Sequence, residues 1–152
     1  MIVELNEAEQ KLAIFLAKAR HQNARKKMVV NHRMGPQSDE TTDLEGIAGE
    51  IAYCKLMNLY PDLQTEFIPG YDCLLPDGTR VDVKTTKYPN GKLISATWKD
   101  IGDIDAFALM VGEMPKYRYA GIMKASELLQ EKRKQNLGHG IVYVATQDEL
   151  CK

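Results

Sequence analysis

The segment YDCLLPDGTRVDVKTT, which begins at Tyr71, places acids and a lysine at a spacing that could carry chemistry. At its centre, Pro76-Asp77-Gly78 predicts a three-residue hairpin loop, because proline presets φ for a turn and glycine accepts the positive φ that such a loop needs. Counting back along both strands from this loop places Asp72 opposite Asp82. Like charges on directly opposed residues destabilise a strand pair, so the pattern suggests a role other than packing.

Strand alternation adds a lysine to this pair of acids. Asp82 and Lys84 project from one face of the strand, whereas Val81 and Val83 project from the other. Because Mg²⁺ prefers carboxylate, water and phosphate oxygens, we interpret Asp72 and Asp82 as metal ligands, with the backbone carbonyl of Val83 as a further oxygen. The ammonium of Lys84 would orient an attacking water and offset charge on a phosphoryl group. The alternative is a surface ion pair of Asp72 with Lys84 beside a solvated Asp82.

A helix predicted over residues 43–59 supplies a third carboxylate, Glu50. Thr42 or Asp43 is its predicted N-cap. The predicted apolar stripe of this helix comprises Leu44, Ile47, Ile51 and Cys54. Gly46 and Gly49 share a face with Glu50, although a glycine inside a helix costs about 1 kcal/mol relative to alanine. Two positions without a side chain beside a carboxylate indicate close approach of a backbone or a ligand. A tight helix-on-sheet contact is the alternative.

At these residues the sequence resembles the PD-(D/E)XK nuclease superfamily. The resemblance rests on the dipeptide Gly49-Glu50 in a helix, Tyr71-Asp72 in a strand and VDVKT at residues 81–85 in the next strand. These motifs follow the family's order, although Tyr71 stands where the family often has proline. The likeness covers residues 43–86 well and is looser beyond them. The chain is also similar to compact nucleases encoded by phages.

The resemblance implies a fold, a cofactor and an activity. The implied fold is α/β, with a mixed central β-sheet flanked by helices and the restriction-endonuclease-like core order αβββαβ. Glu50, Asp72 and Asp82 would hold Mg²⁺ or Mn²⁺, and Lys84 would assist attack by water. The expected activity is hydrolysis of phosphodiester bonds, with DNA as the favoured substrate and endonuclease or exonuclease action left open. The competing hypothesis is a catalytically silent nucleic-acid-binding or protein-interaction module on the same fold.

Residues 18–33 form the one strongly basic segment, with six Lys or Arg, two His and no acid. A solvated helix face is the usual explanation of such a run, and contact with phosphates is the alternative. The residues selected as candidate nucleic-acid contacts are Arg25, Lys26, Lys27, Arg33 and, after the site lysine, Thr85.

Length and composition predict a single domain, with residues 1–42 as an N-terminal helix and loop and residues 43–152 as the nuclease core. The 20 basic and 21 acidic residues give a net charge of -1, which excludes a wholly basic nucleic-acid coat. Without a signal peptide or a run of about 20 apolar residues, the sequence predicts a cytoplasmic protein, in the host cytoplasm if a phage encodes it, with no membrane partner. A homodimer and a protein partner are left open.

The remaining elements follow from hydrophobic periodicity and turn residues. A first helix, capped by Asn6, is predicted over residues 7–28 with an apolar stripe that includes Phe15 and Leu16, and residues 34–42 are predicted as a loop. Predicted strands cover residues 65–68, 71–75, 79–86, 106–111, 117–123 and 141–145, and a last helix covers residues 125–135.

Overall fold

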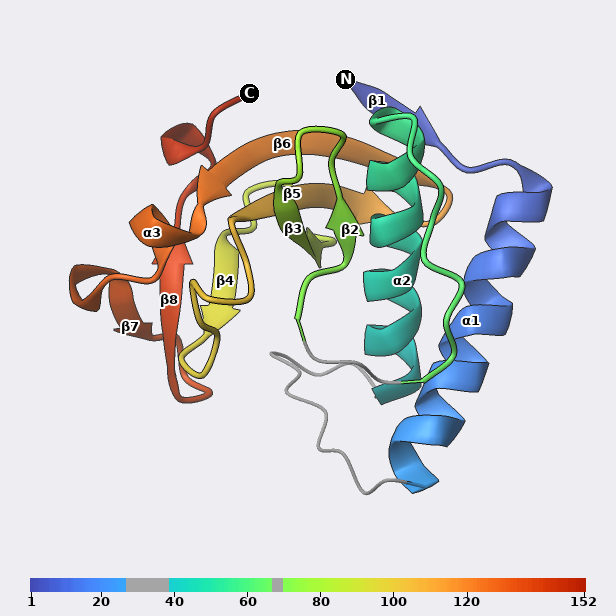
Figure 1. Cartoon of the computed structure of the whole chain (residues 1–152), viewed down its shortest axis with the longest axis horizontal. Coiled ribbons are helices and arrows are strands. Elements are labelled where there is room, and N and C mark those ends of the chain that lie inside the picture. The colour runs from blue at the N-terminus through green and yellow to red at the C-terminus, as the bar shows by residue number, and fades with distance from the viewer. Residues whose placement is uncertain (27–38, 67–69) are drawn as a thin grey trace.

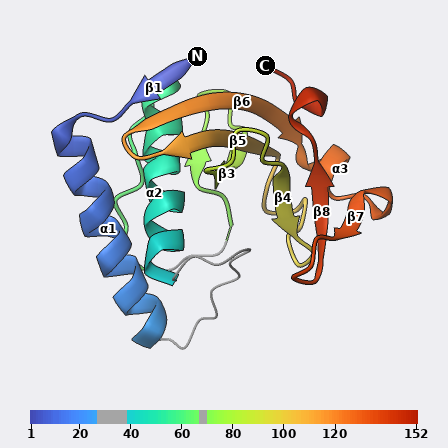
Figure 2. The ribbon, with the colours of Figure 1, turned by 180° about the vertical axis from the view of Figure 1, so that it is seen from behind.

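Helices pack against one face of a β-sheet, and a smaller sheet covers part of the other face, in the computed structural model of this chain (Figure 1). The structure describes residues 1–26, 39–66 and 70–152. Helices α1 (Glu7–Lys26) and α2 (Asp39–Leu56) lie side by side at one end of the molecule. At the other end lie β4 (Leu93–Ala96), α3 (Ala125–Leu128), β7 (Lys134–Asn136) and β8 (Ile141–Ala145). The curved strands β5 (Ala106–Glu113) and β6 (Lys116–Lys124) run between these two ends, as the view from behind also shows (Figure 2).

The larger sheet has five strands in the order β1-β6-β5-β3-β2, and the smaller has three in the order β4-β8-β7, within the described residues. The elements are β1 (Ile2–Glu4), α1 (Glu7–Lys26), α2 (Asp39–Leu56), β2 (Cys73–Leu74), β3 (Arg80–Thr86), β4 (Leu93–Ala96), β5 (Ala106–Glu113), β6 (Lys116–Lys124), α3 (Ala125–Leu128), β7 (Lys134–Asn136) and β8 (Ile141–Ala145), with 3-10 turns at Glu131–Arg133 and Gln147–Glu149.

The larger sheet is mixed. Strand β3 runs parallel to β5, whereas β5 and β6 are antiparallel. Strand β5 is buried on both faces, so that Ala108 and Met110 face the helices while Phe107 and Leu109 join a second core with the smaller sheet and α3. The predicted α/β class with a mixed central sheet is therefore confirmed. Five strands lie between α2 and the four-residue α3 in the described chain, so the order αβββαβ is not matched element for element and the restriction-endonuclease-like core stays a prediction.

Helix α1 begins as predicted, at a reciprocal cap. Asn6 N donates to Glu9 Oε1 at 2.7 Å and Glu9 N donates to Asn6 Oδ1 at 2.8 Å, which satisfies two backbone donors at the helix start. The predicted apolar stripe is partly wrong. Leu16 is buried, but Phe15 is 63% exposed, because Ala13 and Ala17 form the buried face with Leu16.

Helix α2 begins at Asp39, so the predicted cap at Thr42 or Asp43 and the predicted loop at residues 39–42 are wrong. The acids in the run DETTD suit a first helical turn, where the helix dipole favours negative charge. The helix ends at Leu56 rather than at residue 59. Its predicted apolar stripe is confirmed, since the residues Ile47, Ile51 and Cys54 are buried and Leu44 packs against the same core.

The hairpin that carries the acids has the predicted register. Leu75 N donates to the Thr79 carbonyl and Gly78 N donates to the Leu75 carbonyl, both at 2.9 Å. Gly78 takes the positive φ of 90° that the turn requires. Cys73 then pairs with Val81, so the sequence correctly predicts how β2 and β3 are aligned.

Other boundaries differ from the predictions. Residues 65 and 66 are not part of a strand, and the remainder of the predicted strand at 65–68 lies outside the described residues. The predicted helix at 125–135 shrinks to α3, a 3-10 turn and β7. Strands β1 and β4 are not predicted at all, whereas β5, β6 and β8 contain the predicted runs. None of the described helices is long and apolar enough to span a bilayer.

Candidate functional site

Asp72 stands immediately before β2, beside β3. Its backbone N–H donates to the Val81 carbonyl at 2.8 Å, and its Oδ2 accepts a hydrogen bond of 2.7 Å from Val83 N–H. The side chain thus replaces a strand partner at Val83. Because these bonds bracket Asp82, the two acids lie next to each other, as the predicted register requires. The carbonyl of Val83 as a metal ligand stays a prediction.

Asp82 is almost completely buried, with 1% of its surface exposed. Lys84 Nζ lies 2.7 Å from Asp82 Oδ1, and Lys99 Nζ lies 2.8 Å from Asp82 Oδ2. Both oxygens of this buried carboxylate therefore face ammonium groups. Burying a charge is costly unless it is paired, so the two lysines offset the burial of Asp82.

Glu50 joins the two aspartates from α2. Its Oε2 lies 3.3 Å from Arg20 Nη1 of α1. The same guanidinium donates to the carbonyls of Asp62 and Gln64, each at 2.8 Å. Arg20 therefore ties both helices to the chain that follows α2, and it sets the position of the Glu50 carboxylate.

Gly49 allows α2 to lie directly on β3. A Cβ at this position would overlap the side chain of Thr85, so the tight helix-on-sheet contact accounts for this glycine. Glu50, the next residue, is thereby held close to the strand that carries Asp82. No described atom lies within 4 Å of a Cβ built at Gly46, so packing within the described residues does not account for that glycine.

The three carboxyl groups influence one another electrostatically. Burial raises the pKa of Glu50 to about 7, against the charge of Arg20, and Asp82 adds to the increase. Burial also raises the pKa of Asp72 well above its usual range, with further contributions from Glu50 and Asp82. Each of these acids is therefore destabilised as an anion by its surroundings, which is the condition under which a nearby cation binds strongly.

The negative charges of these acids also change the pKa of Lys84. Burial alone would lower its pKa, but the negative charges of Asp82, Asp72 and Glu50 outweigh this effect and raise it. The amine therefore stays protonated at neutral pH. As a fixed positive charge it can stabilise an anion or orient a water, but it is unsuited to accept a proton.

The residues fit a hard divalent cation in their chemistry, although they are not assembled around one. Residues 1–26, 39–66 and 70–152 contain no group of three or more His, Cys, Asp or Glu that could hold a metal as it stands. Lys84 and Lys99 lie against both oxygens of Asp82, and Arg20 is paired with Glu50. Asp82 is buried and Glu50 and Asp72 are partly buried, and their carboxyl groups are nonetheless oxygen ligands of the kind that Mg²⁺ accepts.

The structure adds two residues to the site that sequence reasoning did not select for it. Arg20 belongs to the basic segment at residues 18–33, and Lys99 lies outside the motifs on which the resemblance rests. Lys99 Nζ also lies 4.8 Å from the centre of the Trp98 ring. No local spacing relates Lys99 to Asp82, so its place becomes visible only in the folded chain.

Comparison with known proteins places the site in a family. A family model described as "Family of unknown function (DUF5843)" matches residues 3–117. The chain belongs to DUF5843. The matched part contains all six charged residues of the site, namely Arg20, Glu50, Asp72, Asp82, Lys84 and Lys99. Neither a curated protein nor a solved structure matches the chain significantly.

The structure describes only some of the residues that are predicted to contact nucleic acid in this DUF5843 protein. Thr85 Oγ1 is buried beneath α2 without a hydrogen-bond partner among the described residues, so its structural role is to pack against Gly49. Arg25 and Lys26 belong to the last turn of α1, but their side chains are not described, and Lys27 and Arg33 lie outside the described residues. These contacts stay predictions.

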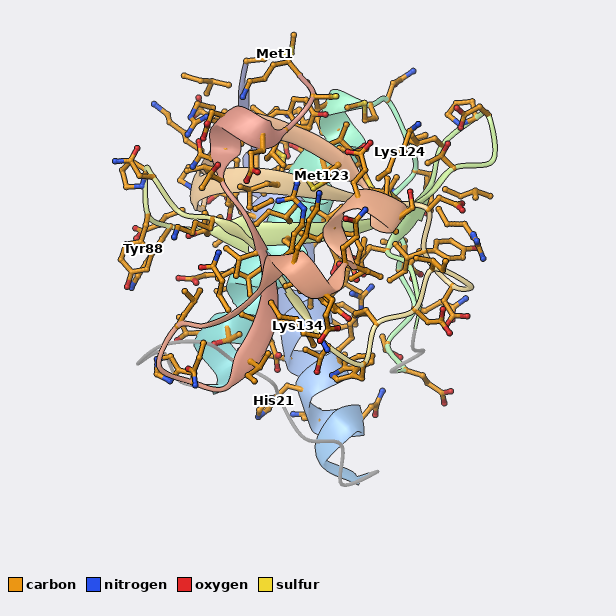
Figure 3. All side chains as sticks on the ribbon, turned by 90° about the vertical axis from the view of Figure 1, so that its left-hand side faces the viewer. Met1, His21, Tyr88, Met123, Lys124 and Lys134 are labelled. Atoms are coloured by element: carbon orange, nitrogen blue, oxygen red, sulfur yellow. The ribbon has the colours of Figure 1, made fainter. Side chains whose placement is uncertain are left out.

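Two aromatic side chains outside the acid cluster, Tyr88 and Tyr143, each have a lysine near the ring among the described residues. Tyr88 projects outward from the turn after β3 (Figure 3) and is 54% exposed. Lys87 Nζ lies 5.5 Å from the centre of its ring, and Lys134 Nζ lies 5.7 Å from the centre of the Tyr143 ring.

His21 lies on α1, where its Nδ1 is 2.9 Å from Asp43 Oδ2.

Proposed function

We propose that this DUF5843 protein is a metal-dependent nuclease that hydrolyses phosphodiester bonds, with DNA as the favoured substrate. One observation carries the proposal: α2, the residue before β2, and β3 bring Glu50, Asp72 and Asp82 together with Lys84. The sequence resemblance to PD-(D/E)XK nucleases assigns roles to the same four residues, and the fold gives them neighbouring positions.

In this proposal Mg²⁺ or Mn²⁺ would be held by Glu50, Asp72 and Asp82, with the Val83 carbonyl as a further oxygen. When bound, the ion would polarise the scissile phosphate and lower the pKa of a water molecule. The chain itself supplies fixed positions for the ligands. Gly49 sets the distance of α2 from β3, and Val83 N–H orients Asp72.

Lys84 has a separate role in the proposal. Since its pKa is raised, the ammonium stays charged, and it would offset the negative charge that develops on the phosphoryl group. It would also orient the attacking water by donating a hydrogen bond. A general-base role is disfavoured because the surrounding acids hold the proton on Lys84.

A second function is favoured by a different observation. Among the described residues, the cluster already pairs Glu50 with Arg20, and Asp82 with Lys84 and Lys99, without a metal. A catalytically silent nucleic-acid-binding or protein-interaction module would be expected to have such internal pairing. Uptake of Mn²⁺ separates the two functions, since only the nuclease requires it.

The test is cleavage of linear, circular, single-stranded and branched DNA with Mg²⁺ or Mn²⁺. The wild type is compared with Lys84→Ala and with Lys116→Ala, which removes an exposed lysine of β6. The nuclease proposal predicts cleavage by the wild type and the Lys116 variant, and a loss of about 100-fold or more in Lys84→Ala. A folded wild type that cuts none of these substrates with either metal would favour the silent module.

A further inference from the structure

Asp82 has two ammonium groups against it, although one cation is enough to neutralise a carboxylate. Lys84 belongs to the same strand as Asp82, and strand alternation alone places it on the same face. Lys99 comes from the segment between β4 and β5, yet its Nζ lies 2.8 Å from Asp82 Oδ2. A separate feature of the fold must therefore bring Lys99 to this acid.

Arg80 provides that feature, at the start of β3. Its guanidinium donates to the Gly102 carbonyl at 2.8 Å and pairs with Asp105 at 2.9 Å. These contacts fix the end of the Lys99 segment only two residues from Asp82 along β3. At the other end, Lys99 N donates to the Ala96 carbonyl at 3.3 Å, so the segment is held on both sides.

Lys99 is also more enclosed than the lysine that the sequence selects. Its side chain is 13% exposed, compared with 30% for Lys84. Confining a long side chain in this way loses rotamer freedom. The Lys99 charge is nonetheless held against an almost buried acid and beside the Trp98 ring. Lys99 therefore belongs to the site and is not part of a surface ion pair.

The charges around Asp82 suggest what this lysine does. Arg20 lies against Glu50, and Lys84 and Lys99 lie against Asp82, so a divalent ion held by these acids would bring two positive charges next to basic side chains. Like charges at this distance repel strongly in a partly dehydrated site. In the proposed mechanism Lys84 stays in the site, so Lys99 is the cation that must leave Asp82.

We propose that Lys99 is an internal counter-ion of Asp82 that competes with the metal. It holds Asp82 Oδ2 in the metal-free protein and withdraws when a divalent cation binds. The inference rests on the proposed function, because it takes Asp82 to be a metal ligand.

The test is calorimetric titration of Mn²⁺ alone into folded wild type, Lys99→Met, Lys99→Gln and Lys99→Arg. Competition predicts that the two neutral variants bind Mn²⁺ about tenfold more tightly than the wild type, the size expected for close charge pairs. Lys99→Arg keeps the charge and should bind like the wild type.

The matched control is Lys134→Met. Lys134 likewise pairs with one carboxylate, that of Glu131 at 2.9 Å, and lies 5.7 Å from the ring centre of Tyr143. It belongs to β7, outside the acid cluster, so its loss should leave Mn²⁺ affinity unchanged. A similar gain in this control would show that the effect is not local and would overturn the inference.

The outcomes also separate the inference from the proposed function. If both neutral variants bind Mn²⁺ as tightly as the wild type or more weakly, the proposed counter-ion role of Lys99 is overturned, whereas the proposed metal site is not. No Mn²⁺ binding in the wild type or any variant overturns the proposed function together with the inference.

A measurement on the wild type keeps the test valid if the neutral variants do not fold. The ¹³C-labelled ε-carbon signal of Lys99, assigned by its loss in Lys99→Arg, should shift as Mg²⁺ saturates the protein. A Lys99 signal that stays in place while Mg²⁺ binds would contradict the withdrawal of Lys99 from Asp82.

Discussion

The carboxyl group of Asp72 is held where burial and two neighbouring acids oppose its charge. Such a group is expected to favour function at the expense of stability. We predict that Asp72→Asn raises the free energy of unfolding of the metal-free protein by about 0.5–2 kcal/mol, the usual size of a stabilising substitution. The asparagine amide oxygen can still accept the bond from Val83 N–H.

Urea unfolding at pH 7 with EDTA measures this effect, and cleavage assays on the same samples should show loss of activity. Asp103→Asn serves as control, because Asp103 is exposed in the segment after β4 and its substitution should change neither quantity. An Asp72→Asn variant less stable than the wild type would show that the Asp72 charge is not repelled by its surroundings.

Asp105 shows the opposite behaviour. Hydrogen bonds from the Arg80 side chain and then from Arg80 N–H lower its pKa to about 2, compared with about 3.9 in an unfolded chain. Its stabilising contribution is therefore fully present above about pH 4 and is lost as the pH falls toward 2. Because the pair is exposed, we expect a small effect.

The prediction for Asp105 is tested by urea midpoints at pH 5.5 and pH 3. The midpoint of the wild type should fall more between these pH values than that of Asp105→Asn. Equal decreases in the two proteins would mean that the pair with Arg80 does not contribute to acid sensitivity.

At the level of residues, some members of the site can be predicted from the sequence and others cannot. Asp72 and Asp82 are predicted as neighbours because the hairpin from residue 72 to residue 82 has an unambiguous turn. Lys99 is not predicted, because its contact with Asp82 depends on the path of a loop and on the Arg80 anchor. The side-chain contact of Arg20 with Glu50 likewise depends on how α1 packs on α2.

At the level of elements, the contact of α2 with β3 sets the position of Glu50. We predict that Gly49→Ala lowers the free energy of unfolding by about 1–3 kcal/mol, because the added methyl group overlaps Thr85 and must displace the helix. The same displacement would move Glu50 and reduce cleavage.

Gly46→Ala is the matched control, since it adds the same methyl group to the same helix where no described atom lies within 4 Å. Removing a glycine from a helix interior should stabilise the protein by about 0.5–1 kcal/mol. Thermal or urea unfolding measures both variants. If Gly49→Ala is as stable as Gly46→Ala, the close packing of α2 on β3 is wrong.

Elements with strong local signals are predicted better than elements that depend on distant partners. The capping residues Asn6 and Glu9 fix the start of α1, and a run of apolar residues identifies β5. Strand β1 has only three residues and is stabilised by pairing with β6, more than 100 residues later. The predicted helix at 125–135 fails because 3-10 and strand structure replace helix after Leu128.

At the level of the whole molecule, the net charge of -1 requires that any binding of DNA depend on a local basic surface. The segment with Arg25, Lys26 and Lys27 is the sequence's candidate for that surface. We predict that charge reversal of all three weakens DNA binding and makes its salt dependence shallower, by about 0.9 in the log-log slope for each lost phosphate contact.

Fluorescence anisotropy with labelled duplex DNA at several salt concentrations measures this slope. A control triple variant reverses the same number of charges on the exposed residues Lys116, Lys124 and Lys132. If the two triple variants behave alike, the effect comes from net charge, and the basic segment has no specific role.

Cleavage of labelled DNA with Mg²⁺ tests whether Glu50, Asp72 and Asp82 form a metal-dependent nuclease site. The comparison needs wild type, Asp82→Asn and the exposed control Asp103→Asn, each shown to be folded. We expect cleavage by the wild type and the Asp103 variant, abolished by EDTA, and none by Asp82→Asn. Cleavage by Asp82→Asn at the rate of the wild type, or cleavage that survives EDTA, would contradict the proposed site.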